Sequence, residues 1–107
     1  MLTASGAIAL THEDVLKSKV PTILFKHHTD LDDTIIIPRI NGIITIVGGS
    51  LSHASIVARE YNKACLVDCQ GLKIDLEKKG IEIGGKFYPA GTNVILDGTT
   101  GGVYLKW

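Results

Sequence analysis

Short hydrophobic runs, separated by Gly, Pro and charged residues, predict a chain that consists mainly of strands. Runs of this kind, most of them rich in β-branched residues, cover Ser5–Leu10, Thr22–Lys26, Ile43–Val47 and Ala64–Asp68, and they are typical of buried strands. Toward the C-terminus, turn-forming residues divide the chain into further short strands. These dividing residues are Gly80, Gly84, Gly85, Pro89 and Gly91.

Polar residues predict two short helices in the first third of the chain. Thr11 is a suitable N-cap, acidic residues follow it in the first turn, and the predicted helix ends near Ser18. Thr29 is a second candidate N-cap, for a helix from Asp30 to about Ile36. Pro38 argues against a longer helix, because proline lacks the backbone N–H that a helix interior requires.

Two segments allow two interpretations. The β-branched run Ile35–Ile37 suits a strand as well as the end of the second helix. Between Gly71 and Lys79, alternating apolar residues favour a strand, whereas the charged residues 77–79 suit a helix end.

A third and longest helix is predicted from about His53 to Tyr61. Together these elements indicate a layered α/β domain.

The length and composition indicate one cytoplasmic, globular domain covering residues 1–107. A chain of 107 residues, 45% of them hydrophobic, can bury a core without disulfides. Eleven basic residues balance eleven acidic ones, so the charge gives no sign of nucleic-acid binding. No apolar run approaches the roughly 20 residues that a membrane span needs, and the N-terminus does not resemble a signal peptide. We therefore expect neither a nucleic acid nor a membrane as a partner.

The two cysteines are predicted to be reduced thiols. Cys65 lies in an apolar run, where it suits a small core residue, and Cys69 follows near the end of that strand. Two thiols do not complete a structural zinc site without histidine ligands. His27 and His28 form an adjacent pair, but nothing completes a ligand set around them, so a solvated loop is favoured. We expect no metal site in this chain.

The strongest candidate site of the sequence follows the predicted strand Ile43–Val47. This strand leads into Gly48 and Gly49, and then into Ser52 and His53. Glycine lets a ligand approach the backbone closely, and Ser52 is a suitable N-cap for the helix that begins at His53. The first N–H groups of a helix stabilise an anion, because they carry partial positive charge and have no partners within the helix. The arrangement therefore predicts that His53 carries a negatively charged group, with a phosphoryl group as the foremost candidate.

A purely structural interpretation competes with this one. A Gly-Gly turn between a strand and a helix is common in α/β proteins, and a single histidine at a helix start is more often structural than catalytic. Short motifs have a high false-positive risk, so spacing alone favours the structural interpretation. The length and order of the whole string shift the balance toward function.

The string resembles the phosphohistidine, or mobile, domain of the phosphoenolpyruvate-utilising enzymes. This family includes pyruvate phosphate dikinase, phosphoenolpyruvate synthase, enzyme I of the sugar phosphotransferase system and rifampicin phosphotransferase. The residues that fit its motif are Gly48, Gly49, Ser52, His53, Ile56, Val57, Ala58 and Arg59. The resemblance implies that His53 is the histidine that carries the phosphoryl group. Arg59 lies off the face of His53 on the predicted helix, which favours a structural ion pair over a phosphate contact.

The resemblance extends along most of the chain, with two departures. Leu51 stands where much of the family has Thr, so a hydroxyl able to donate to the phosphoryl group is missing, and the Leu-Ser-His version looks more like the rifampicin-phosphotransferase-like branch. The segment Thr29–Asp33 resembles a Thr-x-Pro-Asp-Asp segment of the family, although Leu31 replaces the proline. Residues 93–104 resemble the closing strand, Asp-Gly turn and last strand of the family.

The resemblance implies a swivelling three-layer β/β/α domain that acts as a phosphoryl carrier. His53 would accept a phosphoryl group from ATP or phosphoenolpyruvate and pass it to a second acceptor, with Gly48, Gly49 and Ser52 at the phosphate. No ATP-binding motif or phosphoenolpyruvate barrel is recognisable, so the chain would not be a complete enzyme. Its expected partners are ATP-binding and phosphoenolpyruvate- or pyruvate-binding domains or subunits, which would also hold Mg²⁺. The alternative is a non-catalytic binding or regulatory module of the same fold, and Leu51 keeps this alternative open.

Overall fold

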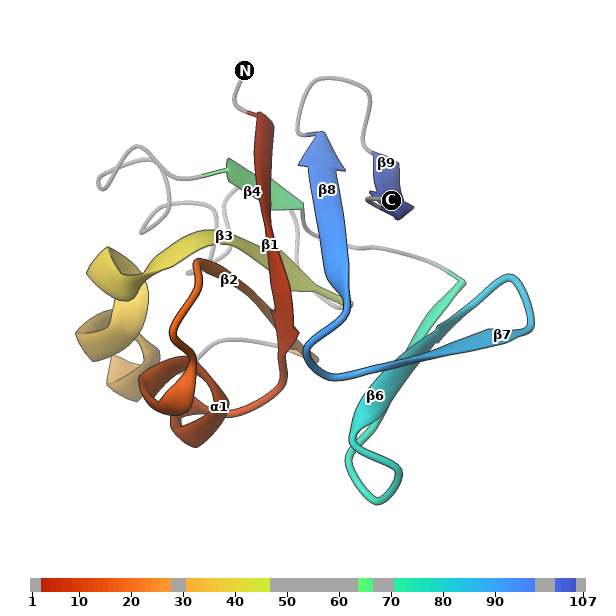
Figure 1. The fold of residues 1–107 in the computed structure, drawn as a ribbon, viewed down its shortest axis with the longest axis horizontal. Coiled ribbons are helices and arrows are strands. Elements are labelled where there is room, and N and C mark those ends of the chain that lie inside the picture. The colour runs from red at the N-terminus through yellow and green to blue at the C-terminus, as the bar shows by residue number, and fades with distance from the viewer. Residues whose placement is uncertain (1–2, 28–30, 47–63, 67–70, 98–101, 106–107) are drawn as a thin grey trace.

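The computed structural model describes residues 3–27, 31–46, 64–66, 71–97 and 102–105, which form strands and two short helices (Figure 1). The strands are β1 (Thr3–Ala9), β2 (Thr22–Lys26), β3 (Ile40–Thr45), β4 (Ala64–Leu66), β5 (Leu72–Asp75), β6 (Gly80–Ile83), β7 (Lys86–Pro89), β8 (Asn93–Asp97) and β9 (Gly102–Leu105). The helices are α1 (His12–Lys17) and the 3-10 helix η1 (Leu31–Arg39). The mixed α/β content predicted from the sequence is confirmed.

The strands form two sheets. The larger sheet has the order β4-β3-β2-β1-β8-β9, and β1, β2, β3 and β4 run parallel to one another in it. Strands β8 and β9 add an antiparallel edge, and the pairing of Asp97 with Gly102 fits the predicted hairpin connection. The smaller sheet has the order β5-β6-β7 and is antiparallel throughout.

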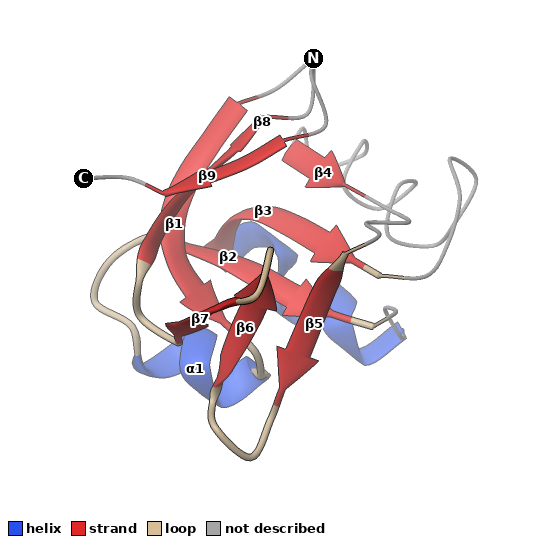
Figure 2. Ribbon diagram, turned by 90° about the vertical axis from the view of Figure 1, so that its right-hand side faces the viewer, coloured by secondary structure: helices blue, strands red, loops and turns tan. Residues whose placement is uncertain are grey.

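Different elements cover the two faces of the larger sheet. On one face, Ile23 and Phe25 of β2 belong to a hydrophobic cluster that includes Leu72 and Ile81 of the smaller sheet. On the other face, Leu24 belongs to a cluster with residues of both helices, namely Val15, Ile36 and Ile37. Figure 1 shows α1 and η1 on the left of β1 with β6 and β7 on its right, and Figure 2 shows the smaller sheet in front of β2 and β3. Because alternate residues of a strand face opposite sides, β2 is apolar on both.

Helix α1 forms as its capping residues predict. The hydroxyl oxygen of Thr11 accepts a hydrogen bond from the Asp14 backbone N–H at 3.1 Å, and the Ser18 backbone N–H donates to the Val15 carbonyl oxygen at 3.3 Å. An ion pair joins Glu13 and Lys17, one helical turn apart. The hydrogen bond between the two side chains and the positive charge of Lys17 lower the pKa of the Glu13 carboxyl. The same hydrogen bond and the negative charge of Glu13 raise the pKa of the Lys17 ammonium.

The helix predicted from Asp30 to about Ile36 was wrong in its C-terminal limit. Instead of ending near Ile36, the helix continues as a 3-10 helix through Pro38 to Arg39, and the alternative strand at Ile35–Ile37 does not form. Pro38 fits because its fixed φ is close to that of a 3-10 helix and it lies one residue before the end. Packing selects this conformation, since Ile36 and Ile37 are buried against the larger sheet.

For residues 71–79 the strand interpretation is confirmed and the helix end is wrong. Strand β5 stops at Asp75, and residues 76–79 form the turn that leads to β6. Within this turn the Lys78 backbone N–H donates to the Asp75 carboxylate at 3.0 Å, and Lys79 has a φ of 55°. The charged residues therefore belong to a solvent-exposed hairpin turn.

Gly80, the first residue of β6, has no room for a side chain. A Cβ atom built there would lie 2.5 Å from the Tyr88 carbonyl oxygen and would also collide with the end of the Phe87 ring. Phe87 is 41% exposed, and the register places it on the outer face of the sheet, on the same side as Gly80. The absence of a side chain at Gly80 thus lets the ring lie across β6.

We predict that Gly80→Ala lowers the free energy of unfolding by about 1–3 kcal/mol, the usual cost of overpacking a close contact. Urea denaturation measures this change. Repeating Gly80→Ala in a Phe87→Ala background separates the two contacts. The Tyr88 carbonyl oxygen stays in place when the ring is removed, so most of the penalty should persist. Full relief in the double variant would show that the ring alone is the obstacle.

Two threonines differ in what their hydroxyl groups do in the folded chain. The Thr22 hydroxyl is buried without a hydrogen-bond partner among the described residues, whereas the Thr11 hydroxyl caps α1. A buried, unpaired hydroxyl group is costly. We predict that Thr22→Val raises the free energy of unfolding by about 1 kcal/mol and that Thr11→Val lowers it by a similar amount. Parallel denaturation curves test both, and a destabilised Thr22→Val variant would contradict the first.

Candidate functional site

Strand β3 leads into the sequence motif and is firmly held. Ile43 and Ile44 are fully buried, on opposite faces of the larger sheet, and Thr45 is 1% exposed with no partner for its hydroxyl among the described residues. Beyond the strand, Ile46 packs against the cluster that faces the smaller sheet. Only Val47 separates Ile46 from Gly48 in the sequence. The chain is thus anchored until two residues before the motif.

The neighbouring strand β2 ends at the same edge of the sheet. The parallel register pairs Lys26, the last residue of β2, with Thr45, the last residue of β3. Past this pair, the Ile46 backbone N–H donates to the Lys26 carbonyl oxygen at 3.1 Å. The motif therefore begins beside the carboxyl ends of parallel strands, which is where α/β sheets usually bind their ligands.

The predicted site residues themselves lie outside the described part of the chain. They are Gly48, Gly49, Ser52 and His53, together with Leu51, Arg59 and the helix predicted from His53 to Tyr61. The strands on either side still constrain this segment, because β3 and β4 are adjacent and parallel. A connection between such strands has to return from the carboxyl to the amino end of the sheet, and a helix usually makes it. The predicted order of strand, motif and helix agrees with this topology, and the site residues remain predictions.

A side-chain hydrogen bond anchors β3 at its amino end. The Asn41 side-chain amide donates to the Ser5 carbonyl oxygen of β1 at 2.8 Å. Strand β2 lies between β1 and β3, and its register with β3 shifts between Thr22 and Ile23. Asn41 thus links β3 to β1 where β2 begins. This hydrogen bond holds the amino end of β3, which is the end opposite to the motif.

Other candidate residues of the sequence can be placed in part. His27 is exposed, as expected of a solvated loop, while His28 and Cys69 lie outside the described residues. Cys65 falls within β4. Among the described residues, no group of three His, Cys, Asp or Glu side chains is arranged to hold a metal ion. None of the described helices is long and apolar enough to cross a membrane.

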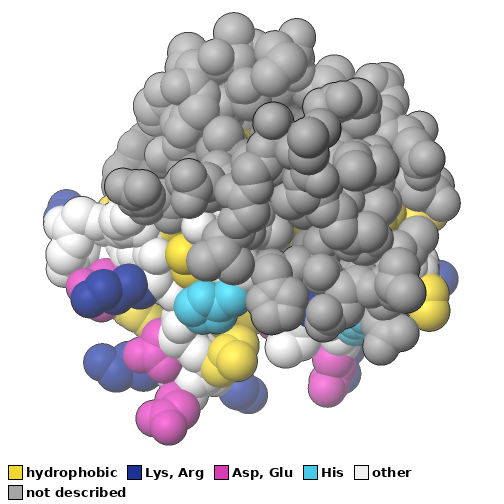
Figure 3. Space-filling view, turned by 180° about the vertical axis from the view of Figure 1, so that it is seen from behind, with side chains coloured by type: hydrophobic (Ala, Val, Ile, Leu, Met, Phe, Trp, Pro, Cys, Tyr) yellow, Lys and Arg dark blue, Asp and Glu magenta, His cyan; other side chains and the backbone are white. Residues whose placement is uncertain are grey.

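The described surface carries charges of both signs. In the view from behind, Lys and Arg side chains alternate with Asp and Glu side chains along the lower rim, and hydrophobic and His side chains lie between them (Figure 3). On this visible part of the described surface, no broad area has a single sign.

The fold and the position of the motif define an α/β domain whose candidate site follows a central parallel strand. The chain belongs to the family of the PEP-utilising enzyme mobile domain, whose model matches residues 19–101. This confirms the family to which the sequence motif points.

Several pyruvate, phosphate dikinases are similar to this chain. The enzyme of Clostridium symbiosum is 38% identical over 82 residues, which are 77% of this chain and 9% of that protein. That of Entamoeba histolytica is 33% identical over 103 residues, covering 94% of this chain and 12% of the relative. Pyruvate, phosphate dikinase 2 of Zea mays is 33% identical over 105 residues, which cover 95% of this chain and 12% of that protein. The chain thus spans about a tenth of the length of these relatives. The likeness of its Leu-Ser-His version to the rifampicin-phosphotransferase-like branch remains a prediction.

Proposed function

We propose that this chain is a phosphoryl carrier domain of a phosphotransferase related to pyruvate phosphate dikinase and phosphoenolpyruvate synthase. His53 accepts a phosphoryl group from ATP or phosphoenolpyruvate and passes it to a second acceptor. The observation that supports this most directly is the family match across residues 19–101, which includes the complete Gly48 to His53 string. The start of that string beside the carboxyl ends of β2 and β3 is consistent with an anion site.

The proposed chemistry is nucleophilic, covalent catalysis. A neutral imidazole nitrogen of His53 attacks the phosphorus atom, an N–P bond forms, and the P–O bond to the donor breaks, with its electron pair leaving on the donor oxygen. In the second step an acceptor oxygen attacks the phosphorus and the N–P electron pair returns to the imidazole. Gly48, Gly49 and Ser52 contribute backbone N–H groups at the predicted helix start, which favour the negative charge.

The rest of the reaction is assigned to other domains or subunits. The matched segments make up 9% and 12% of two of the relatives, and the sequence contains no recognisable ATP-binding motif. We propose that partner domains bind ATP, phosphoenolpyruvate or pyruvate, and hold the Mg²⁺ that phosphoryl transfer requires. A swivelling three-layer β/β/α domain would move between them. The clusters on the two faces of the larger sheet supply the packing for such layers.

The intact mass of the chain, measured under non-acidic conditions, tests this function. The complete chain is incubated with an extract of its source cells, Mg²⁺ and either ATP or phosphoenolpyruvate. His27→Ala serves as the matched control for His53→Ala, since His27 is an exposed histidine at the end of β2. We expect one acid-labile phosphoryl group on the wild type and on His27→Ala, and none on His53→Ala, with unchanged circular dichroism for all three.

Two outcomes would overturn the proposal. A phosphoryl group retained by His53→Ala would move the acceptor to another residue. If the wild type stays unmodified in an extract that contains active enzymes of this family, the domain is a binding or regulatory module. Leu51→Thr would then show whether the missing hydroxyl is the cause.

A further inference from the structure

The dipeptide Asn41-Gly42 lies at the amino end of β3. We propose that Asn41 is a site of spontaneous deamidation, that the fold holds this reaction in check, and that its products release the amino end of β3. This property is independent of the proposed phosphoryl transfer. Its basis is the coincidence of an Asn-Gly step, a shift in the strand register and a side-chain hydrogen bond to another strand.

Deamidation of this asparagine needs only its own side chain, the next residue and water. The backbone nitrogen of Gly42 attacks the side-chain carbonyl carbon of Asn41, so that a new C–N bond forms and the bond from this carbon to Nδ2 breaks. The Nδ2 group takes up the proton of the Gly42 N–H and leaves as ammonia. Water then opens the cyclic imide at either carbonyl carbon and yields aspartate or isoaspartate. Gly42 favours the attack because no side chain obstructs its nitrogen and its backbone is permissive.

The strand register leaves Asn41 out of the pairing with β2. Thr22 pairs with Ile40 and Ile23 pairs with Gly42, so that Asn41 is an extra residue, as in a β-bulge. The pairing of β3 with β4 also begins only at Gly42. Because an extra residue of this kind lacks the ladder contacts of its neighbours, other interactions have to restrain it.

The hydrogen bond of the Asn41 side chain to β1 supplies such a restraint. Its Nδ2 donates to the Ser5 carbonyl oxygen at 2.8 Å, in a partly buried position. Cyclisation has to rotate the side chain and the backbone between Asn41 and Gly42. It therefore competes with this hydrogen bond and with the pairing of Gly42 to both neighbouring strands. We expect the reaction to proceed from states in which the amino end of β3 has opened.

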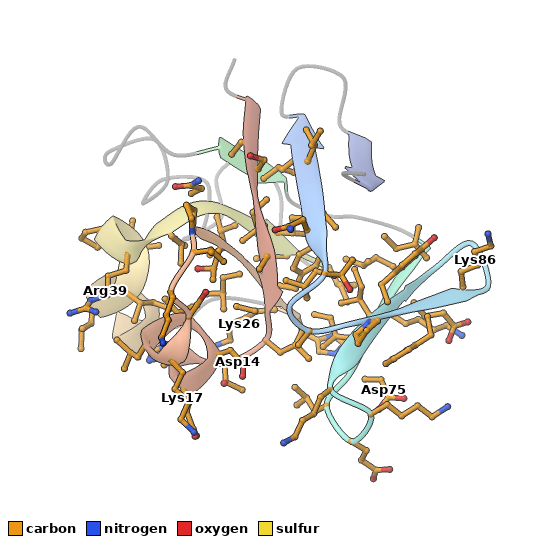
Figure 4. The ribbon with its side chains drawn as sticks, in the orientation of Figure 1. Asp14, Lys17, Lys26, Arg39, Asp75 and Lys86 are labelled. Atoms are coloured by element: carbon orange, nitrogen blue, oxygen red, sulfur yellow. The ribbon has the colours of Figure 1, made fainter. Side chains whose placement is uncertain are left out.

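The amino end of β3 is a suitable place for local opening. The strand follows directly on η1, whose last residues Pro38 and Arg39 are exposed, whereas Ile40 is fully buried. In Figure 4, Arg39 points away from the sheets. Asn41 thus lies two residues from an exposed junction, and the ends of elements open more readily than their centres.

Neither product restores the link to β1. An aspartate carboxylate accepts hydrogen bonds but donates none, and the Ser5 carbonyl oxygen is also an acceptor. Isoaspartate in addition lengthens the main chain by one carbon atom next to Gly42, which pairs with Ile23 and Ala64. Both products should therefore weaken the attachment of the amino end of β3.

Peptide mapping by mass spectrometry tests the site, because it separates aspartate from isoaspartate at each asparagine. The complete chain is kept at mildly alkaline pH, once folded and once unfolded in guanidinium chloride. Asn93, which is exposed and precedes the β-branched Val94, is the internal control. We expect Asn41 to convert faster than Asn93 in the unfolded chain, and at least about tenfold more slowly in the folded chain, since opening costs free energy. Equal rates for Asn41 in both states, or no preference for Asn41 over Asn93 in the unfolded chain, would overturn the proposal.

Asn41→Asp introduces one product directly and tests its effect on β3. We expect its denaturation midpoint to be lower than that of the wild type, and its amide hydrogen exchange to be faster at the amino end of β3. Asn93→Asp adds the same charge at an exposed strand position and should leave both unchanged. If Asn41→Asp matches Asn93→Asp in midpoint and exchange, the hydrogen bond does not anchor the strand and the proposed release is wrong.

Discussion

Burial of strands β2 and β3 on both faces is the constraint on which the rest of the structure depends. Ile23, Leu24 and Phe25 are consecutive and fully buried, so neither face of β2 can remain open to water. Each buried side chain of this size contributes about 1.5–3 kcal/mol of transfer free energy. If one face of the sheet were uncovered, the contribution of the side chains on that face would be lost. The helices cover one face and the smaller sheet covers the other, which explains why a chain of this length contains both.

The same burial determines how the candidate site is presented. A strand packed on both faces and paired with neighbours on both edges is a rigid support, and functional segments are commonly attached to such supports. Here β3 has β2 and β4 as neighbours, and the motif follows directly after it. Lys26 and Thr45, the last residues of β2 and β3, therefore have fixed backbone positions relative to each other at the end of β3 from which the chain continues to the motif.

The sequence predicts local features well and non-local ones poorly. The run Thr22–Lys26 coincides with β2, and Thr11 caps α1, because β-branched composition and capping act within a few residues. The course of residues 31–39 depends on the packing of Ile36 and Ile37 against strands far away in the sequence, so local propensity misjudged it. The motif around His53 was likewise recognisable from adjacent residues.

A carrier has to release the group that it binds, and this limits how strongly its site should hold a phosphoryl group. Interactions that are equally strong in the phosphorylated intermediate and in the transition state do not accelerate the second transfer, and stronger binding of the intermediate slows it. Several buried cations would therefore hinder a carrier. The neutral backbone N–H groups of the glycines and of the predicted helix start would offer moderate compensation. The proposed partner domains would then supply the remaining positive charge at the moment of transfer, when Mg²⁺ and further basic groups reach the phosphoryl oxygens.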